Sequence, residues 1–85
     1  MQVWPEVGLH YALVGKMANA QGRIEEGEAA LQAAHDILSL TLPPSNRAII
    51  ERVELHQALA AAQKDGDMER AYGLAMAIAA TCKDL

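Results

Sequence analysis

The 85-residue chain contains few of the residues that many structural and functional classes depend on. Its one cysteine, Cys82, excludes an internal disulfide and indicates a reducing compartment, cytoplasmic or nuclear. No apolar run approaches the roughly 20 residues that a transmembrane helix needs. The seven Lys and Arg are scattered and the net charge is −4, so neither nucleic acid nor an anionic membrane is an expected partner.

Aromatic residues make up only 4% of the chain, Phe is absent, and no segment shows the apolar–polar alternation of a strand. Alanine is abundant instead, with 17 residues, and it favours helices that can approach closely. The sequence therefore predicts an all-α chain of about four helices, over residues 5–20, 24–40, 46–64 and 68–82. We expect one domain over residues 1–85, built from two antiparallel hairpins at about 5–41 and 45–83.

The spacing of the glycines points to a particular kind of hairpin. Gly15 and Gly22 lie seven residues apart, and Gly27, Leu31 and Ala34 follow at the intervals of a tetratricopeptide repeat, in which small residues lie where two helices touch. A glycine inside a helix costs roughly 1 kcal/mol relative to alanine, so close packing is the expected reason for Gly15 and Gly27. The positions expected to pack the helices are Tyr11, Gly15, Ala18, Gly22, Gly27, Leu31, Ala34, Leu59 and Ala71.

Apolar residues recur at helical spacing in the first and last helices and are expected to face inward. In the first helix these are Val7, Tyr11, Val14 and Ala18, with Leu9, Leu13 and Met17 beside them. In the last helix they are Met68, Ala71, Ala75, Ile78 and Cys82.

A shift of 44 residues superimposes the two halves of the sequence. Gly22 falls on Gly66, and Gly27 falls on Ala71. This internal repeat predicts two stacked hairpins in a right-handed superhelix of the tetratricopeptide type. An ordinary four-helix bundle with scattered glycines is the alternative.

Several segments between residues 4 and 60 carry a more specific resemblance, namely Trp4-Pro5-Glu6-Val7-Gly8-Leu9, Leu13-Val14-Gly15-Lys16-Met17, Gly22, Glu26, Ala29-Ala30-Leu31, Ala34-His35-Asp36-Ile37-Leu38 and Ile49-Ile50-Glu51. Together they resemble the C-terminal tetratricopeptide-like domain of the lysine methyltransferases that carry SET and MYND domains. Trp4 stands where that family has His, and Gly27 where it usually has Ala. Kinesin light chain repeats share the long period. The resemblance implies a wall of a substrate cleft and a docking surface for chaperone or substrate peptides. In that family, the binding of S-adenosylmethionine and zinc, and catalysis, depend on motifs that this sequence does not contain.

The titratable side chains give no catalytic or metal pattern. His10, His35 and His56 lie 25 and 21 residues apart, whereas helical zinc ligands come in pairs three or four apart. Glu25, Glu26 and Glu28 are expected to form a solvated helix start, and Cys82 is expected in the core. We therefore expect no catalytic residue, no metal and no cofactor.

A groove is the better candidate site. In stacked hairpins the first helix of each pair lines the concave side, which gives Lys16, Asn19, Arg52 and His56, together with Ala12 and Ala60. Lys16, Asn19 and Arg52 are expected to hold an acidic peptide by charge-assisted hydrogen bonds. The alternative is that these are ordinary surface polar residues.

Two functions follow from these patterns. The first is a helical-repeat module that binds a peptide or partner protein without catalysing a reaction. The second is the C-terminal part of a SET-type methyltransferase, which closes the substrate cleft. Because about three stacked units are usual for stability and the sequence has two, we expect the chain to pack on an adjacent domain, a partner or a second copy of itself.

Overall fold

The structure, a computed structural model, describes residues 5–42 and 46–81. The described residues form four helices, α1 (Pro5–Ala20), α2 (Ile24–Thr41), α3 (Arg47–Asp65) and α4 (Met68–Thr81). The predicted all-α class and the helix positions are confirmed to within one residue at the ends that are described. The expected core position of Cys82 lies outside the described residues.

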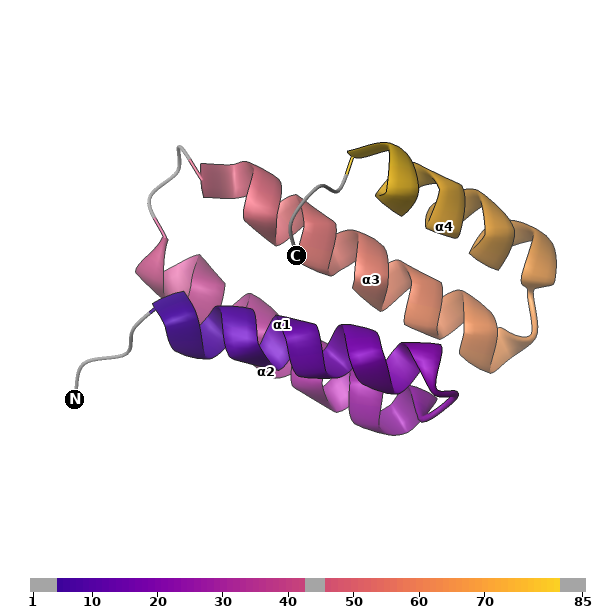
Figure 1. Cartoon of the computed structure of the whole chain (residues 1–85), viewed down its shortest axis with the longest axis horizontal. Helices are drawn as coiled ribbons and strands as arrows, with labels where there is room; N and C mark the ends of the chain where they lie inside the picture. The colour runs from indigo at the N-terminus through magenta and orange to yellow at the C-terminus, as the bar shows by residue number, and fades with distance from the viewer. Residues whose placement is uncertain (1–4, 43–45, 82–85) are drawn as a thin grey trace.

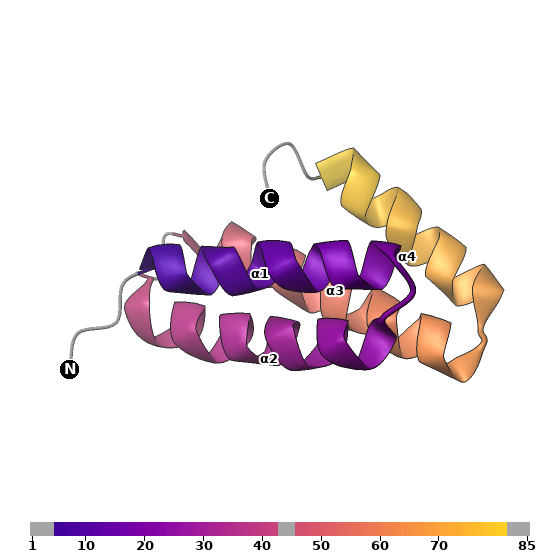
Figure 2. The same cartoon turned by 60° about the horizontal axis from the view of Figure 1, so that its bottom comes forward.

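The helices form two antiparallel hairpins. Figures 1 and 2 show α1 and α2 side by side, α3 running next to them, and α4 folding back along α3. Within the described residues α4 contacts α3 alone, whereas α3 contacts α1, α2 and α4. The right-handed superhelical stacking stays a prediction.

Both hairpin turns close with the same hydrogen-bond pattern. Gly22 and Gly66 have positive φ angles of 83° and 75°, the left-handed region that favours glycine. After α1, Arg23 N–H donates to the Ala18 carbonyl over 2.9 Å; after α3, Asp67 N–H donates to the Ala62 carbonyl over 2.9 Å. This is the Schellman arrangement, and it recurs at the 44-residue offset. The turns are therefore equivalent in structure as well as in sequence.

The first hairpin ends in extended backbone. Leu42 has φ −92° and ψ 141°, and its N–H still donates to the Leu38 carbonyl. A residue that precedes proline disfavours the helical conformation, and Pro43 follows Leu42 in the sequence.

The core lies between α1, α2 and α3. Its fully buried members are Ala12, Leu31, Ala34, Leu38 and Val53, with Leu42, Ile49 and Ile50 packed against them. Among the described side chains of α4, only Ala71 is buried. The stability of the described fold therefore rests mainly on its first three helices.

The face that α1 turns toward α2 differs from the expected one. Its buried positions are Gly8, Ala12, Gly15, Ala18 and Asn19. The large residues Val7, Tyr11 and Val14 are exposed instead, as are Leu9, Leu13 and Met17. The prediction that Tyr11 packs between the helices is therefore wrong: its side chain is 39% exposed.

Small residues explain this orientation of α1. A Cβ built on Gly8 would lie 2.7 Å from the Leu38 Cγ, and one on Gly15 would lie 2.6 Å from the Leu31 Cγ. The leucines of α2 thus occupy the space that the two glycines leave, and the helices approach more closely than larger residues allow. The close packing expected at Gly15, Gly27, Leu31 and Ala34 is present at this contact.

Two further packing predictions need correction. Gly22 has no atom within 4 Å of a built Cβ, so its role is the turn conformation and not helix packing. On α4, Met68 and Ala75 are exposed, whereas Ala71 is buried and Leu74 and Ile78 are half-buried. The packed face of α4 therefore includes Ala71 and Ile78 of the predicted stripe, but it has Leu74 in place of Met68 and Ala75.

Candidate groove and polar pocket

One face of α3 carries residues that line two hollows. Residues separated by three or four positions share a helix face, and this face carries Ala48, Arg52, Leu55, Leu59 and Gln63. We call this face, with its two hollows, the α3 groove.

The hollow nearer the hairpin turns lies between α1 and α3 and has a volume of about 190 Å³. We call it the α1–α3 pocket. Its lining residues are Lys16, Asn19, Ala20, His56, Leu59 and Gln63. Three of the four residues predicted for a groove therefore meet in one place.

Asn19 is buried to an unusual degree for a polar residue, with 5% of its surface exposed. The side chain lies against Gly27 of α2, where a Cβ would collide with the Asn19 Oδ1. Gly27 thus provides the space that lets Asn19 turn inward. Neither Oδ1 nor Nδ2 of Asn19 has a hydrogen-bond partner among the described residues.

His56 lies in the pocket with 4% of its surface exposed. Its Nε2 atom has no hydrogen-bond partner among the described residues. Burial, and then the positive charge of Lys16, lowers the pKa of His56 below its ordinary value. The ring is therefore neutral at pH 7 and can accept or donate one hydrogen bond at Nε2, according to its tautomer.

Gln63 completes the polar lining. Its Oε1 atom is buried and also without a hydrogen-bond partner in the described part of the chain. A buried polar atom that lacks a partner costs about 1–3 kcal/mol, and native proteins contain few of them. Their concentration around one hollow marks the α1–α3 pocket as the candidate site.

The second hollow lies further along α3 and is lined by Ala48, Glu51, Arg52 and Leu55, with a volume of about 240 Å³. Arg52 is therefore on the same groove but not in the α1–α3 pocket. It precedes His56 by four residues, which is about 6 Å along a helix axis.

Two positions expected to line the groove lie elsewhere. Ala12 and Ala60 are fully buried, and Ala12 belongs to the core. Asn19 and His56 are not the surface polar residues of the alternative interpretation. Leu59, expected to pack helices, is half-buried and lines the α1–α3 pocket. Sequence reasoning missed Gln63, although it follows Arg52 and Leu59 on the same helix face.

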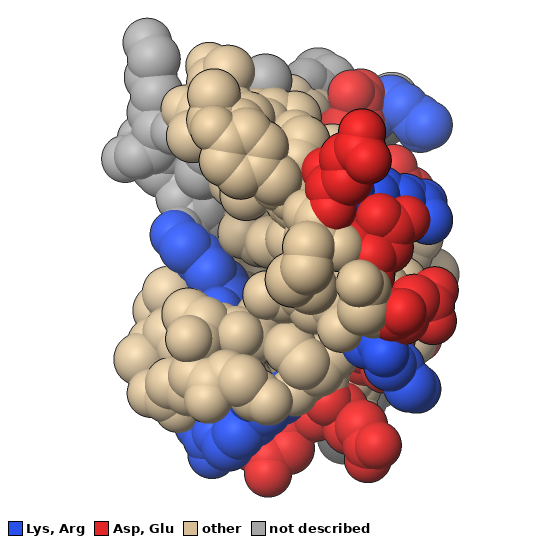
Figure 3. All heavy atoms as spheres, turned by 90° about the vertical axis from the view of Figure 1, so that its right-hand side faces the viewer, with Lys and Arg blue, Asp and Glu red and all other residues tan. Residues whose placement is uncertain are grey.

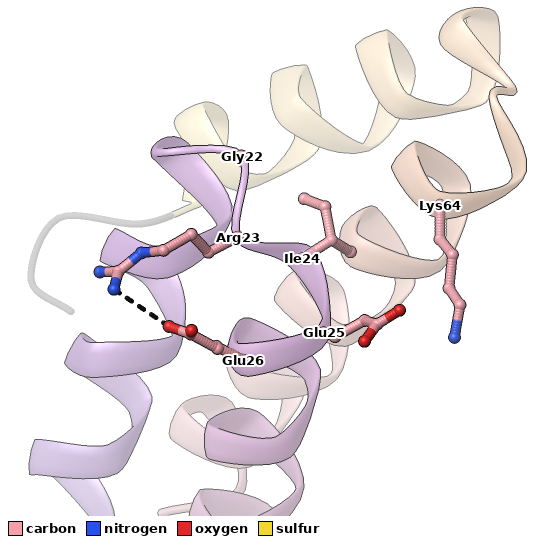
Figure 4. Close-up of a pocket in the computed structure, with 6 residues that line it drawn as sticks. All are labelled: Gly22, Arg23, Ile24, Glu25, Glu26 and Lys64. Carbon is pink, nitrogen blue, oxygen red and sulfur yellow. Dashed lines mark ion pairs between the residues drawn. The ribbon is translucent and has the colours of Figure 1, made fainter.

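A third hollow is a weaker candidate. It has a volume of about 470 Å³ and lies beside the start of α2, as Figure 4 shows. Arg23 points toward Glu26, and their side chains pair over 3.0 Å. Lys64, which also lines this hollow, pairs with Glu28 over 3.3 Å. Opposite charges at this place satisfy one another, which leaves no convergent set of groups for a ligand.

The remaining titratable residues lie apart from the pocket. His35 Nε2 lies 3.0 Å from Glu54 Oε2, which ties α2 to α3. The exposed His10 makes an edge contact with Tyr11, at 6.3 Å between ring centroids. Within residues 5–42 and 46–81 no three metal-binding side chains come together, and none of the described helices is long and apolar enough to cross a membrane.

Charge is unevenly distributed around the molecule. Residues 7–22, which include most of α1, contain no acidic residue. Figure 3 views the end that carries both hairpin turns; acidic side chains gather along one side of it, and a basic side chain lies in an indentation on the opposite side.

Compared with family models, curated protein sequences and solved structures, the chain matches none. The resemblance to SET and MYND methyltransferases therefore remains an expectation from sequence motifs.

Proposed function

We propose that the chain is a helical-repeat interaction module that binds a peptide, or an extended segment of a partner protein, in the α3 groove. The observation that carries this proposal is the meeting of Asn19, His56 and Gln63 at one hollow, with buried polar atoms that no described residue satisfies.

The rest of the groove suits an extended acidic segment. Arg52 and Lys16 line the two hollows and place positive charge along the groove. Leu55 and Leu59 alternate with these polar groups and offer half-buried apolar surface. A peptide with apolar and acidic residues therefore complements the groove better than a basic one. We place this module in a reducing compartment, cytoplasm or nucleus, on the ground of its single cysteine.

A selection from a displayed random peptide library, with the full chain as bait, tests this proposal. We expect acidic and apolar residues to be enriched, and the selected peptides to bind the variants Lys16→Glu and Arg52→Glu at least tenfold more weakly. Arg70→Glu is the matched control, because Arg70 is exposed on α4 outside both hollows. Failure to enrich any peptide, or equal binding by all three variants, would contradict the proposal.

The alternative is that the chain closes the substrate cleft of a larger SET-type methyltransferase. The exposed large residues of α1 favour it, since Val7, Tyr11 and Val14 form an apolar strip about half a turn around the helix from Lys16, which faces α3. An adjacent domain would cover that strip. Mapping the 5′ end of the native transcript tests the idea: an upstream frame with SET-type motifs supports it, and a frame that opens at Met1 opposes it.

A further inference from the structure

Helix α4 is apolar on every side, although it packs on one side only. Residues 71–80 carry no charged side chain. Among the described residues α4 contacts α3 alone, and the side that packs holds the buried Ala71 with the half-buried Leu74 and Ile78. Tyr72 lies about 100° around the helix from Ala71 and about 160° from Leu74. A helix that is hydrophobic all round is normally buried, so the outer side of α4 is expected to have a partner.

The outer side of α4 carries a row of large apolar side chains. Met68, Tyr72 and Met76 follow one another at intervals of four residues, and each is more than half exposed. We call these three residues the α4 strip. Single exposed apolar side chains are common on protein surfaces, but a continuous row of them marks an interaction surface.

Helix α1 carries a similar row at the other side of the fold. Val7, Tyr11 and Val14, which we call the α1 strip, are exposed and lie about half a turn around the helix from Lys16, which faces α3. Figure 1 shows α3 between α1 and α4. The two strips therefore lie on opposite outer faces of the stacked hairpins. In helical-repeat proteins the end units usually have polar outer faces, which both ends of this stack lack.

The contact between the two hairpins indicates what the outer side of α4 binds. Glu28 and His35 of α2 each pair with a side chain of α3. A shift of 44 residues places Tyr72 at the position of Glu28. It also places Ala79 at the position of His35, and both equivalents on α4 are exposed. The outer side of α4 is thus the surface on which a following hairpin would pack, as α3 packs on α2.

The same comparison identifies the helix that would pack there. The helix that packs on α2 is α3, the first helix of its hairpin, and α1 is the first helix of the other hairpin. The pair of Glu28 with Lys64 joins the start of α2 to the end of α3, so these two helices run antiparallel. A second copy in the equivalent place would lay the end of its α1 at the start of α4.

The charges at these helix ends agree with that arrangement. Asp65, Asp67 and Glu69 surround the start of α4, whereas residues 7–22 contain no acidic residue and Arg23 follows the end of α1. An acidic helix start would therefore meet a basic helix end, as it does between α2 and α3. Two copies of an acidic chain can approach at this place without repulsion between like charges.

We propose that this chain associates head to tail, with the α4 strip of one copy packed on the α1 strip of the next. The contact joins two different surfaces, so each copy keeps one strip exposed, and association continues into rings or open chains. This inference goes beyond the proposed function and does not depend on it, because neither strip belongs to the α3 groove.

Sedimentation velocity of the full chain at increasing concentration tests the proposal. The mean mass should rise steadily above that of one chain. We expect a dissociation constant on the order of 100 μM, because two short helix faces bury less than a standard interface of about 1,600 Å². A chain that stays monomeric up to about 1 mM, ten times that constant, would overturn the proposal and leave the strips to a different protein.

Variants of the two strips give the decisive experiment. Tyr72→Glu disables the α4 strip and Val14→Glu the α1 strip, and each variant alone should be monomeric. Their equimolar mixture should form a dimer and nothing larger, because each variant supplies the strip that the other lacks. Met76→Glu repeats the test of the α4 strip. Leu40→Glu is the matched control, since Leu40 is 85% exposed on α2 outside both strips, and it should associate as the natural chain does.

The variants also distinguish the other ways in which two copies could pair. If Val14→Glu dimerises alone, α4 pairs with α4, and if Tyr72→Glu dimerises alone, α1 pairs with α1. Either result overturns the head-to-tail contact. Arg52→Glu should weaken peptide binding in the α3 groove while leaving self-association unchanged. Failure of the interaction module and failure of the head-to-tail contact are therefore separate results.

Discussion

Gly15 and Gly27 face each other across the contact between α1 and α2: a Cβ built on either residue would lie 3.1 Å from the carbonyl oxygen of the other. The two helices therefore meet backbone to backbone at this level. Asn19, one turn after Gly15, uses the same space to turn its amide inward. The packing of the first hairpin and the formation of the pocket thus depend on the same pair of glycines.

Gly15→Ala should destabilise the fold. The new Cβ would lie 2.6 Å from the Cγ of Leu31, which is fully buried in the core. We expect the free energy of unfolding to fall by about 1–3 kcal/mol, despite the gain in helix propensity. Urea denaturation followed by circular dichroism measures this.

Gly73→Ala is the matched control for that substitution. Gly73 lies within α4, is exposed, and has no atom within 4 Å of a built Cβ. The same change should therefore stabilise the protein by up to about 1 kcal/mol, the difference in helix propensity. The two variants should shift the urea midpoint in opposite directions, and shifts of the same sign would contradict the packing described for α1 and α2.

Gly22→Ala and Gly66→Ala should have similar costs. Both residues hold positive φ angles in Schellman turns, where a Cβ is unfavourable although neither site is crowded. We expect each substitution to lower the free energy of unfolding by about 1 kcal/mol, and asparagine at either site to cost less than alanine. A large effect at one turn and none at the other, in thermal unfolding, would mean that the two hairpins are not equivalent.

Acid should weaken the fold through His56. The folded state lowers the pKa of this ring, whereas in the unfolded chain the ring titrates near its ordinary value of about 6.5. Between the two values the unfolded state binds more protons, so the free energy of unfolding falls as the pH falls below about 6.5 and levels off below the folded pKa.

Urea denaturation at several pH values between 7.5 and 5 measures this effect. The variant His56→Gln should show a flatter dependence than the natural chain. An unchanged profile in His56→Gln would contradict this interpretation.

Hydrogen exchange should be faster in α4 than in α2. Among the described residues α4 packs on α3 alone and has one buried side chain, Ala71, whereas α2 contributes Leu31, Ala34 and Leu38 to the core. Local opening is easiest where few buried contacts are lost. Exchange of backbone amides followed by NMR checks this, and equal protection in both helices would contradict it.

Much of the fold was predictable because local signals determine where helices begin and end. Gly22, Gly66 and Pro43 mark three helix ends in sequence, and the turns and the extended Leu42 follow from their backbone preferences. The orientation of α1 was not predictable from periodicity alone. Large residues and small residues recur at helical spacing on both of its faces, and the small ones face inward because the leucines of α2 fill the space.

The candidate site was predicted in part. Lys16, Asn19 and His56 do line one hollow, because α1 and α3 are in contact. The burial of Asn19 depends on Gly27, a residue on another helix, and so on a contact that no local pattern specifies. Arg52 belongs to the neighbouring hollow, since four residues along α3 separate it from His56.

The outward position of the large α1 side chains has a thermodynamic consequence. Folding of the chain removes glycine, alanine and leucine surface from water at the α1–α2 contact, but leaves much of Val7, Tyr11 and Val14 hydrated. The free energy from burying those side chains becomes available only on association. Any partner that covers them raises the melting temperature of this chain in proportion to the logarithm of its own concentration, so that thermal stability itself reports occupancy.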